Sequence, residues 1–157
     1  MRNPASLRRS PTTDELAAWR AFIETSERVR GAIGSRLQSD SGLSNGDYSV
    51  LLSLSEATDN RVRSSELAAT IGWERSRLSH HLGRMEQRGL IRRDNCLTDS
   101  RGAEAVLTEE GAAAFRRASS PHLHAIQELF VSALSPEQLE AVTEISRALS
   151  AHLEPPC

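Results

Sequence analysis

The chain has 157 residues and a formal net charge of −2, with 38% hydrophobic and 25% charged residues. A mean hydropathy of −0.42 and the lack of an apolar run of about 18 residues rule out an integral membrane protein and do not suggest a fully disordered chain. One domain, or two small units that share a core, is expected. The opening residues contain no apolar signal core, and the only cysteines are Cys96 and Cys157. We therefore expect a cytoplasmic protein without a disulfide framework.

The basic charge is carried by arginine alone, because the chain contains 19 Arg and no Lys. Residues 61–101 hold nine Arg against five acids, which makes this segment +4 and leaves −6 for the rest. A basic centre between acidic ends is typical of a nucleic-acid module on an acidic scaffold. A solvated helix face is the alternative interpretation. Arginine suits the first one, because its fork matches phosphates and guanine edges.

The first predicted elements are helices. Residues 1–12 are expected to form a flexible arm. Apolar residues at steps of three and four predict a long amphipathic helix from Thr13 to about Leu37, and residues 39–42 interrupt it. A second helix is predicted from about Asn45 or Gly46 to Ala57, followed by a loop at 58–60. Its expected buried residues are Tyr48, Leu51, Leu52 and Leu54.

The next segment predicts a helix-turn-helix. A short helix is expected to start at Ser64-Ser65-Glu66 with a hydroxyl cap and to stop at Gly72. A second helix is expected from about Arg75 to Arg88, with Gly89 as its C-terminal cap. Helix, Gly-containing turn and helix together form this motif. The core-facing residues of the second helix are predicted to be Leu78, Leu82 and Met85.

A β-hairpin and two more helices complete the prediction. Residues 90–93 and 103–107 are expected to pair as strands around a polar loop. Thr108-Glu109-Glu110 begins a helix to about Ala133, which Pro121 should bend or break. Ser135-Pro136-Glu137-Gln138 begins the last helix with a Ser cap and Pro at its first position. The fold class is thus mainly α with a small β-hairpin wing.

Five motifs stand in order along these elements: Ser65-Glu66-Leu67-Ala68, Arg75-Ser76-Arg77-Leu78-Ser79, Arg84-Met85-Glu86-Gln87-Arg88-Gly89-Leu90-Ile91, Asp99-Ser100-Arg101 and Val106-Leu107-Thr108-Glu109-Glu110-Gly111. With the order of the elements, they resemble the MarR family of winged helix-turn-helix regulators over about Leu16 to Leu153. Two departures are Gly102 after Arg101, where many members carry a larger or basic residue, and a weakly basic run at 95–98.

The resemblance implies an obligate homodimer on a pseudo-palindromic operator of double-stranded DNA. It implies a winged helix-turn-helix at 41–107 and dimerisation helices at 13–40 and 108–157, after an arm at 1–12. The residues agree, because the first and last helices present more apolar side chains than one chain of this size easily covers, and a two-fold axis would bury both copies. The recognition helices would then lie about 34 Å apart, one turn of DNA.

Candidate DNA contacts follow from the helix geometry. The helix after Gly72 should enter the major groove with its N-terminal half towards the bases, and Arg77 could bind a guanine edge. Arg75 and Ser65 fit phosphate contacts near helix N-termini, while His81 is the position that can pack inward. Solvated helix surface is the alternative for all of them. The outward residues of this helix are predicted to be Ser76, Arg77, Ser79, His80 and Arg84.

The wing adds further candidates. Arg101 is the best candidate for a minor-groove contact, and Asp99 would then be structural and hold the wing; an exposed, unattached Arg101 is the alternative. Arg92 and Arg93 are adjacent on a strand and should point to opposite faces, so only one, taken as Arg93, is expected to reach a phosphate. Cys96 is a possible redox site beside the arginines, although a single loop cysteine is more often incidental.

No cofactor and no metal are predicted, because His122, His124 and His152 are scattered and have no cysteine partner. The family resemblance also implies a small-molecule effector pocket between the dimer helices and the DNA-binding lobe. Its candidate lining is equally good as core, and comprises Trp19, Phe22, Ile23, Tyr48 and Trp73.

These observations favour a ligand-responsive transcriptional repressor that binds DNA as a homodimer. The alternative is a winged-helix module that binds proteins and not DNA, which the overall acidity and Gly102 would allow. An enzyme is not expected, because the chain shows no Gly-rich phosphate loop, metal-binding His pair or nucleophile elbow.

Overall fold

The computed structural model describes residues 9–95 and 102–154. The described residues form six α-helices, two single turns of 3₁₀ helix and three short strands. In chain order, the α-helices and strands are α1 (Thr13–Ser41), α2 (Asn45–Glu56), β1 (Arg61–Arg63), α3 (Ser64–Ile71), α4 (Arg75–Gln87), β2 (Ile91–Asn95), β3 (Ala103–Leu107), α5 (Glu109–Leu129) and α6 (Pro136–Leu153).

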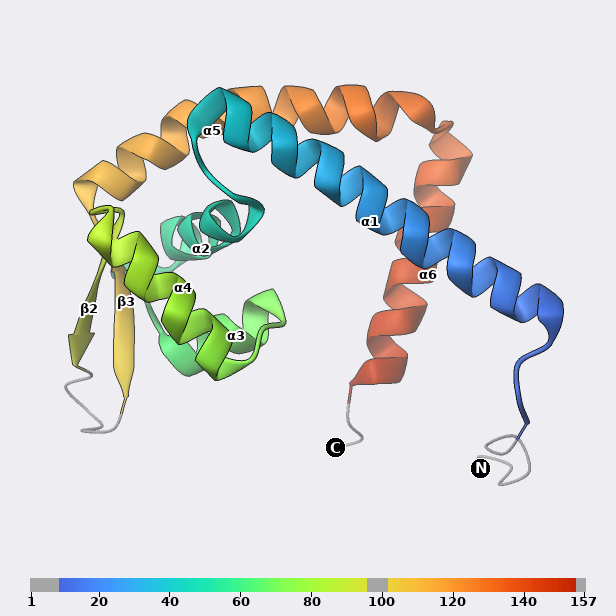
Figure 1. Ribbon diagram of the computed structural model, residues 1–157, viewed down its shortest axis with the longest axis horizontal. Coiled ribbons are helices and arrows are strands. Elements are labelled where there is room, and N and C mark those ends of the chain that lie inside the picture. The colour runs from blue at the N-terminus through green and yellow to red at the C-terminus, as the bar shows by residue number, and fades with distance from the viewer. Residues whose placement is uncertain (1–8, 96–101, 155–157) are drawn as a thin grey trace.

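Two long helices form an arch over a smaller body (Figure 1). α1 packs along α5, and α2 contacts α1, α3, α5 and the sheet. The body under one end of the arch contains α2, α3, α4 and the sheet, whereas α6 descends from the other end. The molecule thus has a core built from several helices and a sheet at one end, and the helices α1 and α6 at the other.

The core of the small body confirms the predicted inner face of α4. Leu78, Leu82 and Met85 are almost completely buried, as their spacing of three and four requires on one helix face. On α2 the prediction was partly wrong, because Leu52 is 37% exposed while Val50 is fully buried. Val50 lies on the same side of α2 as Leu54, four residues on, and Leu52 falls on the flank.

The predicted hairpin is part of a three-stranded antiparallel sheet with the order β1-β3-β2. β3 pairs with β2 from Ile91 opposite Leu107, and its other edge pairs with β1, with Val62 opposite Ala105. β1 was not predicted, because an Arg-Val-Arg run of three residues carries no periodicity of its own. The added strand attaches the wing to the start of α3.

Two N-terminal helix caps were predicted correctly and one wrongly. Thr108 accepts from the Gly111 amide, and Ser135 forms a full capping box with Gln138. The predicted hydroxyl cap of α3 is absent, because the helix already begins at Ser64 and its N-cap, Arg63, makes no side-chain cap bond. α5 continues unbroken through Pro121 and is curved in Figure 1, so of the two predicted outcomes the helix bends and does not break.

Gly111 explains the close joint between the wing and α5. A Cβ atom at this position would lie only 1.9 Å from the carbonyl oxygen of Leu90. The Thr108 hydroxyl donates to the Gly89 carbonyl at 2.6 Å and also accepts from the Gly111 amide. Glycine is therefore required where α5 crosses the end of the α4–β2 turn.

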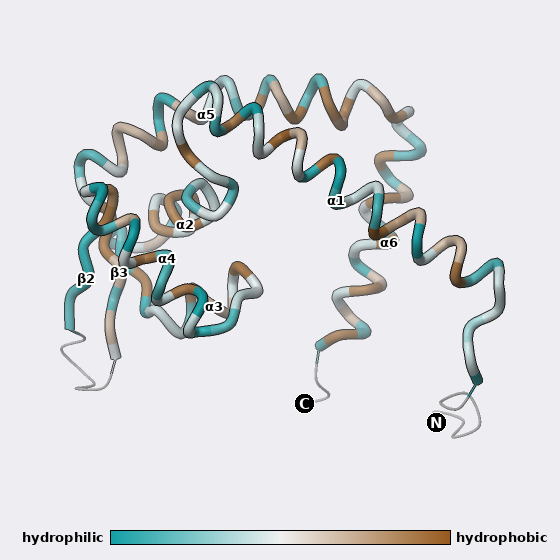
Figure 2. Tube along the Cα trace, viewed as in Figure 1, coloured by the Kyte–Doolittle hydropathy of each residue, from teal (hydrophilic) through white to brown (hydrophobic). Residues whose placement is uncertain are grey.

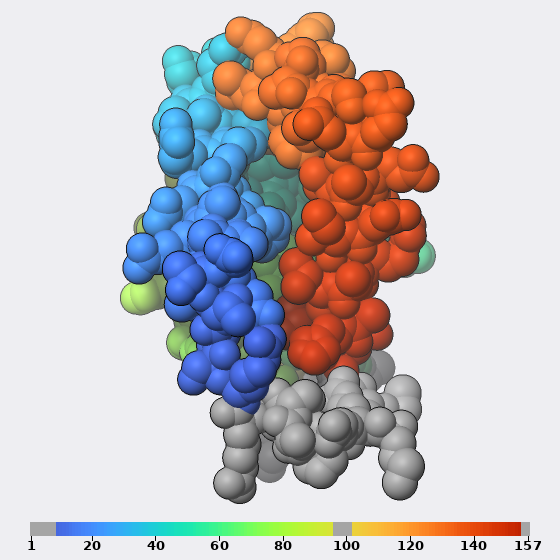
Figure 3. All heavy atoms as spheres, turned by 90° about the vertical axis from the view of Figure 1, so that its right-hand side faces the viewer, coloured from blue at the N-terminus to red at the C-terminus, as the bar shows by residue number. Residues whose placement is uncertain are grey.

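The far end of the arch is apolar and uncovered. No described residue of α6 is buried, and Ile145 and Leu149 are 51% and 44% exposed. Trp19 and Phe22 of α1 are 59% and 46% exposed. Apolar stretches lie along both helices in Figure 2, and Figure 3 shows the two helices as ridges with a furrow between them. Among the described residues, no helix is long and apolar enough to cross a membrane.

Candidate nucleic-acid interface

The outer face of α4 is polar and exposed, and most of its side chains make no hydrogen bond or ion pair with the described residues. Ser76, Arg77, Ser79 and His80 are all exposed. The side chains of Ser76, Ser79 and His80 make no hydrogen bond or ion pair with a described residue, and the same holds for the exposed side chain of Arg75. These groups are therefore available to an external partner with acceptor or phosphate groups.

Four of the predicted contact residues lie around one cleft between α3, α4 and the wing. The cleft has a volume of about 400 Å³, and none of its described lining residues is acidic. Ser65, in the first turn of α3, lines this cleft. The N-terminus of α3 has no side-chain cap, so the backbone amides of its first turn add to the positive potential of the cleft. We call this the wing cleft, and its polar lining includes Arg63, Ser65, Arg75, Ser79 and Arg93.

Arg84 and the strand arginines are engaged within the protein. Arg93 forms an ion pair with Glu86 at 2.9 Å and also bonds the same carboxylate through its backbone amide. Both bonds lower the pKa of Glu86. Arg92 pairs with Asp94 on its own strand, and Arg84 contacts the His81 ring at 3.2 Å. The predicted sites Cys96, Asp99 and Arg101 lie outside the described residues.

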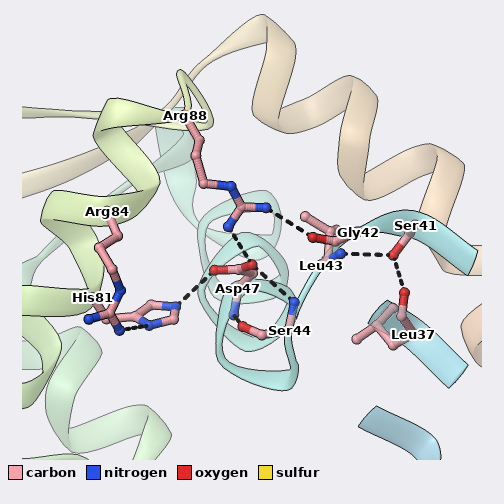
Figure 4. Close-up of polar contacts among 9 residues, drawn as sticks. All are labelled: Leu37, Ser41, Gly42, Leu43, Ser44, Asp47, His81, Arg84 and Arg88. Atoms are coloured by element: carbon pink, nitrogen blue, oxygen red, sulfur yellow. Dashed lines mark hydrogen bonds and ion pairs between the residues drawn. The ribbon is translucent and has the colours of Figure 1, made fainter. Parts of the chain in front are cut away.

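A buried carboxylate holds α4 against α2 (Figure 4). Asp47 is 3% exposed and accepts from the Arg88 guanidinium at 2.7 Å and from the Ser44 amide at 3.0 Å. Arg88 also donates to the Gly42 carbonyl at 3.0 Å. One carboxylate thus joins the α1–α2 connection, the start of α2 and the end of α4.

His81 completes this network from the middle of α4. Its Nε2 atom lies 2.9 Å from Asp47 Oδ1, as a close polar contact without full hydrogen-bond geometry. Burial by itself would raise the pKa of Asp47, but the contacts from His81, Arg88 and the Ser44 amide outweigh it and hold the pKa well below its usual range. Asp47 is therefore charged across the physiological pH range.

The inward position of His81 agrees with the sequence-based expectation, but the roles of Asp47 and Arg88 were missed. The available signal was the spacing Ser44-x-x-Asp47, which is that of a capping box and which the structure contains. The contact from Asp47 to Arg88 spans 41 residues, and no local pattern encodes such a pairing.

A second cleft lies on the other flank of α4, between α1, α2, α5 and the α3–α4 turn. It encloses about 460 Å³, and we call it the central cleft. Of the predicted effector-pocket residues, Tyr48 and Trp73 line it, whereas Trp19, Phe22 and Ile23 do not. The other side chains important here are Arg30, Ser49, Arg77 and His122.

The approach of α2 to this cleft depends on a glycine. A Cβ atom on Gly46 would lie 2.6 Å from the Trp73 ring and 3.1 Å from the His81 ring. Trp73 in turn carries the Arg77 guanidinium 4.1 Å from its ring centre, a cation–π distance. Glycine on α2 thus allows the indole to pack inward and present a face to α4.

The histidines do not form a metal centre within the described chain. No group of three or more His, Cys, Asp or Glu residues there has a geometry that could hold a metal ion. His122 lies against Tyr48 with ring centroids 4.2 Å apart, and burial lowers the pKa of its imidazole. The ring is therefore predominantly neutral at pH 7 and lines the central cleft as an aromatic surface.

Comparisons with known proteins identify similar transcriptional regulators. No protein-family model matches the chain. It is 36% identical to Sco3205 of Streptomyces coelicolor, a MarR family transcriptional regulator solved in complex with DNA, with a TM-score of 0.87 over 94% of this chain and 92% of that one. AbsC, a MarR family regulator of the same organism, is also 36% identical, with a TM-score of 0.84 over 92% of this chain and 97% of that one.

A curated relative agrees with these structures. The transcriptional repressor MprA of Escherichia coli strain K12 is 27% identical over 107 residues, which are 68% of this chain. The match spans 60% of the length of that repressor.

Proposed function

The chain belongs to the MarR family of transcriptional regulators, and we propose that it is a ligand-responsive repressor that binds a pseudo-palindromic operator as a homodimer. In this proposal α4 enters the major groove, and the wing follows the neighbouring backbone. Phosphate contacts supply most of the affinity, and contacts to base edges supply the sequence preference.

The exposed, unpaired face of α4 beside the arginine-lined wing cleft carries this proposal. Arg75 and Ser79 line the cleft from α4, and Ser65 adds the start of α3, so phosphate oxygens would meet hydroxyls, guanidinium groups and helix amides together. Arg77 is the residue we assign to base reading. Arg93 can contribute once it shares its charge between Glu86 and a phosphate, whereas Arg84 has a structural contact to His81.

The homodimer is supported by the uncovered end of the arch. α6 buries no described residue in its own chain and exposes Val142, Ile145, Leu149 and Leu153. A second copy related by a two-fold axis would cover both apolar ridges at once. Full burial of such a side chain contributes roughly 1.5–3 kcal/mol, and covering these partly exposed side chains in both copies offsets the entropic cost of association.

The central cleft is the place we assign to the effector. It lies between the arch and the DNA-binding body, so a ligand there would contact α1, α2, α5 and the turn before α4. A ligand that favours one relative position of these elements shifts the spacing of the two α4 helices. Repression would then be released when that spacing no longer matches the operator.

The proposal is tested by selecting bound genomic fragments and reading their shared inverted repeat. Arg77→Ala is expected to weaken specific operator binding by roughly tenfold or more, as the loss of a base contact worth about 1–3 kcal/mol implies. Binding to random fragments should change much less. Arg147→Ala on α6 is the control, because it removes an exposed arginine far from α4 and should leave both affinities unchanged. Equal losses on both DNAs would reject base reading by Arg77.

The same experiment separates the protein-binding alternative. A DNA-binding dimer must shift random fragments at low salt, with an affinity that falls steeply as salt rises. If the purified dimer binds no fragment at low ionic strength, DNA binding is rejected and the protein-binding module is favoured. The relative Sco3205, which was solved in complex with DNA, favours the first outcome.

A further inference from the structure

His81 is buried in the middle of α4 between two polar partners of opposite kind (Figure 4). Its Nε2 atom lies 2.9 Å from the Asp47 carboxylate of α2, and its Nδ1 atom lies 3.2 Å from the Arg84 guanidinium, one turn further along α4. A carboxylate can only accept hydrogen bonds, whereas a guanidinium can only donate them. The imidazole therefore has to donate on one side and accept on the other.

These partners select one tautomer of the ring. Because Arg84 donates, the Nδ1 atom of His81 must accept and carries no hydrogen. The ring proton is then on Nε2 and faces the Asp47 carboxylate. A proton on Nδ1 would instead point at an N–H group of Arg84. His81 is therefore in the Nε2–H tautomer.

Packing fixes the ring in this orientation. Trp73 meets His81 edge-on, with ring centroids 5.1 Å apart, and the backbone of Gly46 approaches the ring so closely that a Cβ atom there would lie 3.1 Å from it. A half-turn of the ring would place carbon atoms against both Asp47 and Arg84 and leave both contacts without a ring nitrogen. The acceptor Nδ1 is therefore held in one place on the flank of α4.

Arg84 is bound to this ring while most of its donors remain available. The residue is exposed, and its side chain makes no ion pair and no other hydrogen bond with a described residue. It lies seven residues after Arg77, about two turns on, and therefore on the same side of α4. A planar fork of five N–H donors that is fixed in position but has no acidic partner suits a phosphate group.

We propose that Asp47 and His81 are positioning residues for DNA binding: Asp47 holds the Nε2–H tautomer of His81, and the bare Nδ1 atom holds the Arg84 guanidinium where a backbone phosphate binds it. This inference rests on the proposed function, because it requires α4 to enter the major groove. In the homeodomain variant of the helix-turn-helix, the C-terminal end of the recognition helix contacts the DNA backbone. Ordering Arg84 in advance removes part of the entropic cost of that contact.

The tautomer is measured directly by NMR of the nitrogen-labelled protein. The chain has five histidines, and His81→Gln identifies the imidazole signals of His81. We expect a protonated Nε2 atom and an unprotonated Nδ1 atom in the parent protein. In Asp47→Asn the Nε2 proton should move upfield, because its partner is no longer charged. A protonated Nδ1 atom in the parent, or an unmoved Nε2 proton in Asp47→Asn, would overturn the inference.

Affinity for random DNA fragments measures the phosphate contact. Arg84→Gln should weaken binding about tenfold or more, and by the same factor on the operator, because a phosphate contact carries no sequence information. The slope of log affinity against log salt should fall by about two for the dimer, since each copy loses one phosphate contact. Arg147→Gln on α6 is the matched control: it also removes an exposed arginine and should leave affinity and slope unchanged.

Two substitutions of His81 separate positioning from folding. Glutamine has a donor and an acceptor on one planar amide, so His81→Gln can still bond Asp47 and Arg84 and should keep most of the parent affinity. His81→Leu has a similar volume without either bond and should weaken binding about fivefold or more, because an unheld arginine in each copy must be ordered on DNA. In the His81→Leu background, Arg84→Gln should cost a smaller factor than in the parent.

The outcomes separate the inference from the proposed function. A parent protein that binds no DNA at low salt defeats the proposed function, and the role of Arg84 falls with it, while NMR still decides the tautomer. If the parent binds its operator, an unchanged salt slope in Arg84→Gln defeats only the inference. The same holds if His81→Gln loses as much affinity as His81→Leu, or if Arg84→Gln costs the same factor in both backgrounds. The NMR experiment on the parent stays decisive if His81→Leu does not fold.

Discussion

The two ends of the molecule are built on different principles. In the body formed by α2, α3, α4 and the sheet, each helix buries side chains against its own chain, and Asp47 ties three segments together. At the other end, α6 buries none of its described residues, and α1 exposes Trp19 and Phe22. The first region carries its core within one chain, whereas the second leaves apolar side chains exposed that the proposed dimer would cover.

This difference separates two kinds of sensitivity. Substitutions in the body should change the free energy of unfolding of the protomer and leave association intact. Substitutions on the exposed ridge of α6 should act on association, and therefore on any property that needs two copies. Four changes probe this division, and their expected effects decrease in the order given.

Leu149→Asp should have the strongest effect. It places a carboxylate on the apolar ridge of α6, and the two-fold axis would bury it twice, at a cost on the order of several kcal/mol per charge. At micromolar concentration the mass measured by sedimentation equilibrium should fall from that of two 17.2 kDa chains to that of one. Glu144→Gln changes the opposite face of α6 and should remain dimeric. A Leu149→Asp protein that stays dimeric would contradict the assigned interface.

Asp47→Asn should act on the body alone. It removes the negative partner of Arg88 and His81 from a site that is 3% exposed. Loss of one partner of a buried pair costs about 3–5 kcal/mol, and we expect about 2–3 kcal/mol because the Arg88 side chain is itself 44% exposed. Urea unfolding at fixed protein concentration measures the loss. Asp40→Asn breaks an exposed pair with Arg36 and should cost less than about 0.5 kcal/mol.

The pH dependence of stability should report the same carboxylate. The pKa of Asp47 in the folded protein lies far below its usual value. As the pH falls below about 4, the Asp47 carboxylate is therefore protonated in the unfolded chain while it is still charged in the folded protein. Its stabilisation is complete above that pH and is lost as the pH falls further. The unfolding free energy of the parent should therefore decline more steeply between pH 5 and 3 than that of Asp47→Asn. Parallel curves would show that Asp47 is not held charged by the fold.

Ser135→Ala should have the smallest effect of the four. It removes the oxygen that accepts from the Gln138 amide in the capping box of α6, which is worth about 1 kcal/mol. Because α6 lacks a core within its own chain, the loss should appear mainly as weaker dimerisation. Because each dimer contains two such caps, the dissociation constant should rise by up to about thirtyfold, as measured by dilution in a sedimentation experiment. Ser10→Ala, outside any helix, should leave it unchanged.

Local patterns predicted most of the helices because their signals are local. The buried face of α4, the Thr108 cap and the Ser135 capping box each depend on successive residues spaced three or four positions apart. β1 was missed because its three residues become a strand only by pairing with β3, about 43 residues further on. The cap of α3 was misplaced because the preceding strand leads directly into the helix.

The candidate site also contains features that local sequence predicts and features that depend on tertiary packing. Exposure of Ser76, Arg77, Ser79 and His80 follows from the helical period, and the sequence predicts it. The pairing of Arg93 with Glu86, which joins β2 to α4, and the position of Arg77 over Trp73 depend on tertiary packing. The DNA contacts of these residues, and the roles of Asp99, Arg101 and Cys96, remain predictions.

The hydrogen bonds from Arg88 to the Gly42 carbonyl and to Asp47, here called the clamp, link the C-terminal end of α1 to the end of α4. A tilt of α1 therefore moves the end of α4 as well. With 29 residues at a rise of about 1.5 Å each, α1 is roughly 43 Å long. Its first half lies at the apolar end of the molecule, and its last turn leads into the loop that the clamp fastens to the tail of α4. A tilt of about 5° at one end therefore displaces the other by about 4 Å, close to the rise of a single base step.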